Sequence, residues 1–112
     1  MQENDKPVLI YSTFPSSAEA ERIGDMLVAG RMAACVNIIP GMTSIYNWEG
    51  ARQRETEAVM IIKTMASLAG AVMESVRAAH PYASPSRLLL PVTGGSDDFT
   101  SWIAKETEPG PS

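Results

Sequence analysis

The chain has 112 residues, which is enough for one domain and too few for two. It is 45% hydrophobic and 20% charged, a composition typical of a globular fold rather than of a disordered chain. Thirteen acidic residues against nine basic ones give a formal net charge of −4. The basic residues form no run, so nucleic-acid binding by phosphate neutralisation is not expected.

The single cysteine, Cys35, excludes a disulfide within the chain and favours a reducing compartment. Because it lies in an apolar segment, we expect it to be an inert thiol in the core. The first residues, 1–6, carry no apolar stretch of the kind found in signal peptides and are expected to be flexible. No apolar run approaches the ~20 residues that span a bilayer. We therefore expect a cytoplasmic protein without a membrane partner.

A strand and then a helix are predicted for residues 7–30. The apolar run Val8-Leu9-Ile10-Tyr11 predicts the strand. Ser16 and Glu19 stand at the spacing of a capping box, which marks the start of a helix, and Gly30 is a plausible end. Between them, apolar residues recur at helical spacing: Ala20, Ile23, Met26 and Leu27.

A long β-hairpin is predicted next. Residues 33–48 form one strand, bent where Pro40-Gly41 interrupts it. A turn at 49–52 precedes a return strand over 55–64. The inner half of this second arm is apolar on both faces and its outer half is polar.

A helix, a strand and a last helix complete the chain. Small residues at helical spacing predict a helix over 68–79, which Pro81 ends. A fourth strand is predicted over 88–92, and Ser96 is expected to cap the last helix. Residues 106–112 contain two prolines and a glycine and are predicted to be a disordered tail.

The order of these elements, β-α-β-β-α-β-α, is that of an α+β ferredoxin-like fold with a split β-α-β pattern and an added C-terminal helix. We predict a single domain over 7–105, with a four-stranded antiparallel sheet and two helices on one face. The other face then has no cover within the chain, and the hairpin is longer than such a domain needs. Both features indicate assembly with further copies of the chain.

The motifs of catalysis are absent. There is no nucleophile elbow, no phosphate-binding loop, and only one histidine to serve a catalytic triad. Gly94-Gly95-Ser96 is better explained as a loop and helix cap than as an anion site, because Asp97 and Asp98 follow it. We therefore predict a protein that is not an enzyme.

His80 is the only imidazole, so a site with several histidines cannot form within one chain. Glu55 and Glu57 share one face of the predicted return strand. An imidazole together with carboxylates suits copper or zinc. A histidine beside Pro81 at a helix end is also explained as a cap.

Five stretches resemble the CutA divalent-cation tolerance proteins, in order and over roughly residues 7 to 105. They are AACVNIIPG at 33–41, SIYNWEG at 44–50, IIKT at 61–64, HPY at 80–82 and LPV at 90–92. The resemblance implies a ferredoxin-like subunit in a homotrimer built like the PII signalling proteins. It also implies a role in the response to divalent metal ions, notably copper, and no established catalytic reaction.

The resemblance implies copper ligands at three positions: a cysteine on the first strand, a glutamate on the third and a histidine just before the HPY motif. Here these positions hold Ser12, Glu57 and Ala79. Only the glutamate is kept, and His80 lies one residue along. We therefore predict Glu57 as an oxygen ligand and His80 as the nitrogen ligand, for copper or another divalent cation; no other cofactor is indicated.

The motifs also contribute Trp48, Glu49, Lys63 and Tyr82, which the resemblance places in a cleft between subunits or at their interface. Two alternatives to metal binding follow. One is a PII-like regulator that holds a small anion or metabolite through Lys63. The other is a structural trimer that anchors a partner protein.

Overall fold

Residues 5–109 are described in the computed structural model of the chain. The elements follow the predicted order, with a short 3₁₀ turn, η1, added before the second helix. They are β1 (Pro7–Phe14), α1 (Ser17–Ala29), β2 (Cys35–Trp48), β3 (Ala51–Met65), η1 (Ala66–Leu68), α2 (Ala69–Ala79), β4 (Leu88–Pro91) and α3 (Asp97–Glu106).

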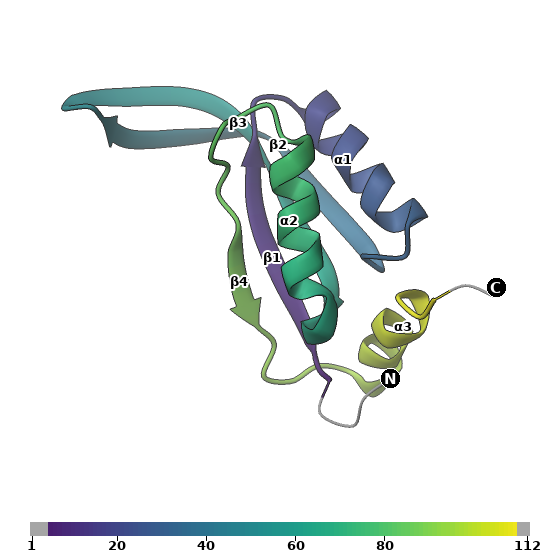
Figure 1. Ribbon diagram of the computed structural model, residues 1–112. Helices are drawn as coiled ribbons and strands as arrows, with labels where there is room; N and C mark the ends of the chain where they lie inside the picture. Colours follow the sequence, from purple (N-terminus) through teal and green to yellow (C-terminus); the bar gives the residue numbers. More distant parts are fainter. Residues whose placement is uncertain (1–4, 110–112) are drawn as a thin grey trace.

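The four strands form one sheet in the order β2-β3-β1-β4, with every neighbouring pair antiparallel. This is the ferredoxin-like arrangement predicted from the sequence, with α1 and α2 side by side on one face (Figure 1). β1 pairs with β3 from Pro7 opposite Met65 to Phe14 opposite Ala58. Residues 51–57 of β3 therefore extend beyond β1, and with β2 they form the projecting hairpin.

The core lies between the sheet and the two helices. Alternate residues of β1 and β3 face α1 and α2 because successive side chains of a strand point to opposite faces. Burial of each large apolar side chain stabilises the fold by about 1.5–3 kcal/mol. The fully buried large apolar residues are Ile10, Phe14, Ile23, Leu27, Met60, Ile62, Val72 and Val76.

The helix starts confirm the predicted positions but not every predicted bond. The backbone N–H of Glu19 donates to the Ser16 hydroxyl at 3.2 Å, as the capping box requires. Ser96 stands at the N-cap of α3, but its side chain makes no capping bond. The Asp98 carboxylate instead accepts from the N–H of Phe99 at 2.8 Å.

The hairpin turn is tighter than predicted. Glu49 and Gly50 have φ values of 50° and 81°, as in the two-residue type I′ turn that matches the twist of paired strands. The return strand therefore begins at Ala51 rather than after a four-residue turn. The register shifts between Ile39 and Met42, which confirms the interruption predicted at the Pro-Gly pair.

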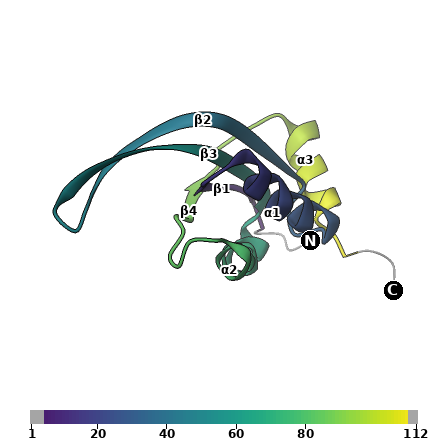
Figure 2. The ribbon, with the colours of Figure 1, turned by 90° about the horizontal axis from the view of Figure 1, so that it is seen from above.

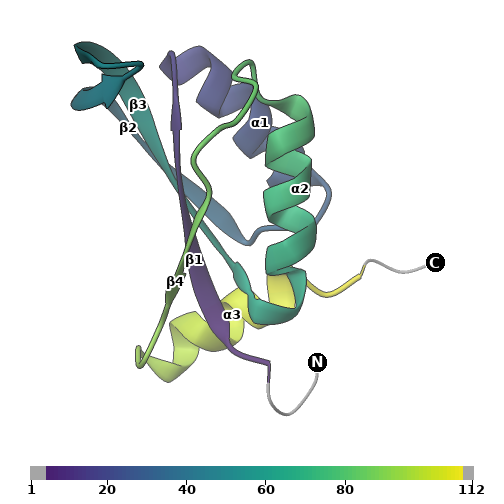
Figure 3. The same ribbon diagram turned by 60° about the vertical axis from the view of Figure 1, so that its left-hand side comes forward.

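α3 packs against the ends of β1 and β3 (Figures 2 and 3). Its Ile103 and Ala104 form a small buried cluster with Ala34 and Met65. Met65 alternates with the core residues of β3 and thus lies on the sheet face away from α1 and α2. The prediction that this face has no cover within the chain is therefore wrong at this end.

The described structure continues past both ends of the predicted domain. α3 includes Glu106, and Thr107 is buried, its hydroxyl donating to the carbonyl of Ile103 at 3.0 Å. At the other end, the Asp5 carboxylate accepts from both the N–H and the hydroxyl of Ser67. The rest of the predicted flexible ends, residues 1–4 and 110–112, lies outside the described residues.

Cys35 departs from its prediction as a core residue. It lies on β2, at the edge of the sheet, opposite Lys63, and is only partly buried. The strand alternates, so a position inside an apolar segment does not by itself place a side chain in the core. Within residues 5–109, no helix has the length and apolar character needed to cross a membrane.

Candidate functional site

A groove of about 790 Å³ lies between the projecting hairpin and the loop that joins α2 to β4. We call it the hairpin groove. Carboxylates, aromatic rings and hydroxyl groups line it, and among residues 5–109 no lysine or arginine does. Its residues are Thr13, Tyr46, Trp48, Gln53, Glu55, Glu57, Tyr82, Ala83, Ser84 and Ser86.

Strand alternation explains how the hairpin contributes to the groove. Gln53, Glu55 and Glu57 are alternate residues of β3 and so share one face. Tyr46 on β2 is paired directly with Gln53 and points to the same side. The polar outer half of the strand is thus an acidic and aromatic wall.

Glu57 is the most unusual residue of this wall. It lies just beyond the last pair of β1 and β3, and only 8% of its surface is exposed. One carboxylate oxygen, Oε2, accepts a hydrogen bond from the phenol of Tyr82 at 2.9 Å. Across residues 5–109, the ion pairs join Glu19 to Arg22 and Glu74 to Arg77, both on exposed helix surfaces. The buried carboxylate therefore has no cationic partner in this part of the chain.

The tyrosines of the groove stay protonated. Burial raises the pKa of Tyr82, and the bond to the Glu57 carboxylate raises it further. The adjacent Glu55 carboxylate raises the pKa of Tyr46. Both phenols are neutral at physiological pH, so the charge of the groove comes from its two carboxylates.

His80 lies beside the groove rather than in its wall. Its Nε2 is 2.7 Å from the carbonyl oxygen of Thr13, and its Nδ1 accepts from the N–H of Tyr82 at 3.0 Å. The ring stacks on Phe14 with centroids 4.5 Å apart, and burial lowers the pKa of the imidazole. This pattern is that of a neutral ring with its proton on Nε2. Both nitrogens are occupied, so His80 positions Tyr82, and a metal could bind the ring only by breaking one of these bonds.

The other positions that the resemblance ties to copper carry no free ligand. Ser12 is fully buried and its hydroxyl donates to the carbonyl of Ser86 at 2.7 Å. Ala79 offers only its carbonyl oxygen, which accepts from Arg22 at 2.8 Å. Over residues 5–109, no three side chains among His, Cys, Asp and Glu gather closely enough to hold a metal ion. Glu57 is thus the one retained ligand position that faces an open space.

The remaining predicted cleft residues do not all meet within one chain. Trp48 lines the groove and is 64% exposed. Glu49 lies in the turn and is not part of the wall. Lys63 is six residues along β3 from Glu57, about 20 Å in an extended strand. Its Nζ lies 5.1 Å from the centre of the Phe99 ring of α3.

Sequence reasoning singled out Glu57, Trp48 and Tyr82 but did not include the serines opposite them. Ser86 is held at the groove by bonds to the N–H and hydroxyl of Thr13, 73 residues earlier. No local pattern signals that contact. Alternation places Glu55 on the same face as Glu57, although only Glu57 is predicted as a ligand.

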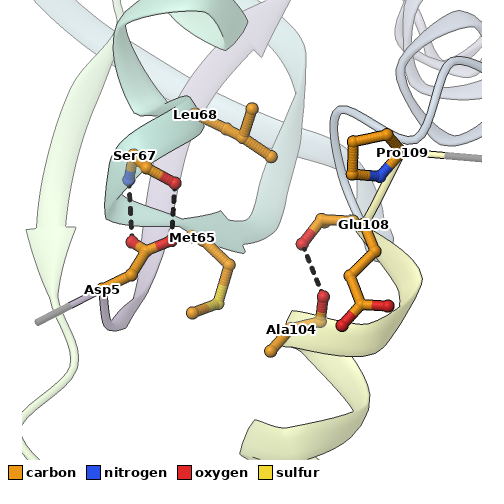
Figure 4. A pocket seen from close by; sticks show the side chains of 8 residues that line it. Asp5, Met65, Ser67, Leu68, Ala104, Glu108 and Pro109 are labelled. Atoms are coloured by element: carbon orange, nitrogen blue, oxygen red, sulfur yellow. Dashed lines mark hydrogen bonds between the residues drawn. The ribbon is translucent and has the colours of Figure 1, made fainter. Parts of the chain in front are cut away.

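A second cavity, of about 340 Å³, lies between η1 and the end of α3 (Figure 4). Its polar groups bond to one another: Asp5 to Ser67, and the Thr107 hydroxyl to the carbonyl of Ala104. The Asp5 contact ties the start of the described chain to η1, and the Thr107 bond closes the end of α3, so we assign the cavity a structural role.

Residues 8–106 match the protein family described as CutA1 divalent ion tolerance protein. The chain belongs to this family. The Escherichia coli (strain K12 / DH10B) divalent-cation tolerance protein CutA is 41% identical over 100 residues, 89% of each chain. The Arabidopsis thaliana protein named Protein CutA, chloroplastic, is 40% identical over 110 residues, 96% of this chain; the chain spans 60% of that protein's length.

The fold agrees with the family. The crystal structure of divalent ion tolerance protein CutA1 from Ehrlichia chaffeensis has a TM-score of 0.90 to this chain at 31% identity, covering 95% of this chain and 99% of that one. The resemblance found in the sequence motifs is therefore confirmed, as are the α+β fold and the assignment to divalent-cation tolerance. The CutA family is named for tolerance and not for a reaction.

Proposed function

We propose that this CutA-family chain acts in tolerance by holding a divalent cation in the hairpin groove, with Glu57 as the anchoring ligand and without catalysing a reaction. The observation that carries the proposal is the 8% exposed Glu57 carboxylate with no cationic partner in the described chain. A buried charge is costly unless it is paired or coordinates a metal. A divalent cation entering from the groove would supply that pairing.

The donor atoms of the groove favour a cation that accepts oxygen ligands. The carboxylates of Glu57 and Glu55 and the hydroxyl groups of the loop are all oxygen donors. Such sets suit manganese or magnesium, with water in the remaining positions. A copper site built from thiolate and imidazole does not fit, because Ser12 has replaced the thiol and both His80 nitrogens are engaged.

We further propose that the working form is a homotrimer. Large apolar side chains stay exposed on the hairpin and on the edge strand β4, a pattern that marks association surfaces. β2 and β4 are also the two open edges of the sheet. The exposed residues outside the hairpin groove are Ile39, Ile45, Leu88, Leu89 and Leu90.

Calorimetric titration of Mn²⁺ and, separately, Cu²⁺ into chelator-stripped protein tests the metal proposal. Glu57→Gln should weaken binding of Mn²⁺ by about tenfold or more, because it removes a charged ligand from a buried position. Glu49→Gln, on the same hairpin but outside the groove, is the matched control and should bind like the parent chain. His80→Gln should leave Mn²⁺ binding nearly unchanged.

Absence of saturable binding in the parent chain, or equal binding by Glu57→Gln, would show that the proposal is wrong. A loss of metal binding seen only in His80→Gln would assign the metal site to the imidazole instead of Glu57. Light scattering tests the assembly separately: the expected mass is that of three 12.0 kDa chains, and a stable monomer would contradict the trimer.

A further inference from the structure

The hairpin groove has features that a metal site does not need. Aromatic rings of Tyr46, Trp48 and Tyr82 line it beside the two carboxylates. Its volume, about 790 Å³, lies in the range of about 300–1,000 Å³ found for pockets that take small organic ligands. A single ion would leave most of this space and all of the aromatic surface unused.

We propose that the hairpin groove binds a small aliphatic diamine or polyamine. One ammonium pairs with Glu57, a second pairs with Glu55, and the methylene chain lies against the aromatic rings. The inference goes beyond metal binding and does not depend on it. Since both ligands use Glu57, they should compete.

The hydrogen bonding of Glu57 favours a primary ammonium over other cations. Its Oε2 accepts from Tyr82, and no bond is made by Oε1 within the described chain. A carboxylate offers about four acceptor positions, and a primary ammonium donates up to three hydrogen bonds. The hydroxyl oxygens of Thr13 and Ser84 are further acceptors in the wall. A quaternary ammonium could use none of them.

The spacing of the carboxylates favours two charges rather than one. Glu55 and Glu57 are two residues apart on one face of β3, so their Cα atoms are about 7 Å apart. Oxygen ligands of one ion lie about 2.0–2.6 Å from it, so both side chains would have to converge to share it. Two ammonium groups joined by a short methylene chain match the strand spacing directly.

The positive charges of the hairpin are directed away from this wall. Arg52 and Arg54 alternate with the groove residues and therefore lie on the opposite face of β3. Arg52 donates to the side-chain oxygen of Asn47 at 2.6 Å. The carboxylates thus remain free to pair with a cationic ligand, and an aromatic ring attracts a cation within about 6 Å of its centroid.

The test uses putrescine with the full chain, treated with a chelator to remove metal ions. Trp48 fluorescence reports binding in a Trp102→Phe background, which leaves one tryptophan. We expect a saturable change, weakened about tenfold or more by Glu57→Gln and about threefold by Glu55→Gln. Glu49→Gln, which loses the same charge on the same hairpin, should bind unchanged. The uncharged analogue 1,4-butanediol should not bind.

Circular dichroism of each variant checks folding. If Glu57→Gln does not fold, Trp48→Ala takes its place, with calorimetry as the readout and a loss of affinity of about threefold. No putrescine binding, equal binding of 1,4-butanediol, or an equal loss in Glu49→Gln would each overturn the diamine proposal. Binding of Mn²⁺ without putrescine would overturn it and leave the metal proposal standing. Binding of putrescine without Mn²⁺ would support it and overturn the metal proposal alone.

Discussion

The two halves of β3 belong to one continuous strand but have opposite environments. Residues 58–65 lie under α1 and α2 or against α3, and most of them are buried. Residues 51–57 project past the end of β1, and all but Gln53 and Glu57 are exposed. Both halves pair antiparallel with β2, with a register shift between Ile39 and Met42. The difference in burial therefore comes from the apolar residues of the inner half and the helices that pack on them, and not from the pairing with β2.

The projecting half is stable only because it continues the buried half. A two-stranded hairpin alone is marginal in water, since neither face is covered. Here the pairing of β2 with β3 begins inside the domain and continues into the projecting half. The molecule is therefore 47 Å long and only 21 Å thick. Side chains of the outer half are thus free to meet a ligand or another copy of the chain.

The largest expected effect contrasts an isoleucine from each region. Ile62 is fully buried in the core, and Ile62→Ala should lower the free energy of unfolding by about 3–4 kcal/mol. Ile45, on the hairpin, is 63% exposed within one chain, so Ile45→Ala should cost less than about 0.5 kcal/mol in the folding of that chain and should act on assembly instead. Urea unfolding at one fixed protein concentration measures both. A similar cost for the two would mean that neighbouring copies bury the hairpin as deeply as the helices bury the core.

A smaller effect contrasts two glycines. A Cβ on Gly24 in α1 would lie 2.8 Å from Cγ2 of Val36, so Gly24→Val overpacks the helix–sheet contact and should cost about 2–3 kcal/mol. Gly50 in the hairpin turn has φ of +81° and open space around it, so Gly50→Ala should cost only the strain, about 1–2 kcal/mol. Thermal unfolding ranks the two. Asparagine should rescue position 50, where its backbone tolerates positive φ, and should fail at 24.

The smallest effect concerns His80, which joins the two regions through Thr13 and Tyr82. Burial lowers its pKa in the folded chain, below the 6.5 expected when unfolded, although the Thr13 carbonyl and the charges of Glu19 and Glu57 act in the other direction. The unfolded chain then binds more protons as pH falls through 6.5, so this contribution to stability is present above that pH and is lost below it. Melting temperatures between pH 7.5 and 5 should show this loss, and His80→Gln should lack it. An identical pH profile in the variant would contradict the assignment.

Local patterns predicted most of the fold. The Ser16 cap, the break at Pro81 and the interruption at Pro40-Gly41 each act within a few residues, so the chain alone shows them. The spacing along the strand also predicts that Glu57 and Lys63 cannot line one site within a single chain, because six residues of strand span about 20 Å. Local patterns could not predict the whole candidate site. The site depends on a long-range contact, in which the loop after α2 reaches the end of β1 and Ser86 bonds to Thr13.

Three features are predictable from the residues alone: the order of the elements, the alternation that puts Glu55 and Glu57 on one face, and the family. Each of these follows from short-range backbone geometry or from motifs read in order. Two features follow from the packed molecule instead: the Glu57 carboxylate is buried with no cationic partner among residues 5–109, and both nitrogens of His80 are engaged. Burial and hydrogen bonding between distant segments depend on which surfaces pack together, and no local pattern along the chain records that.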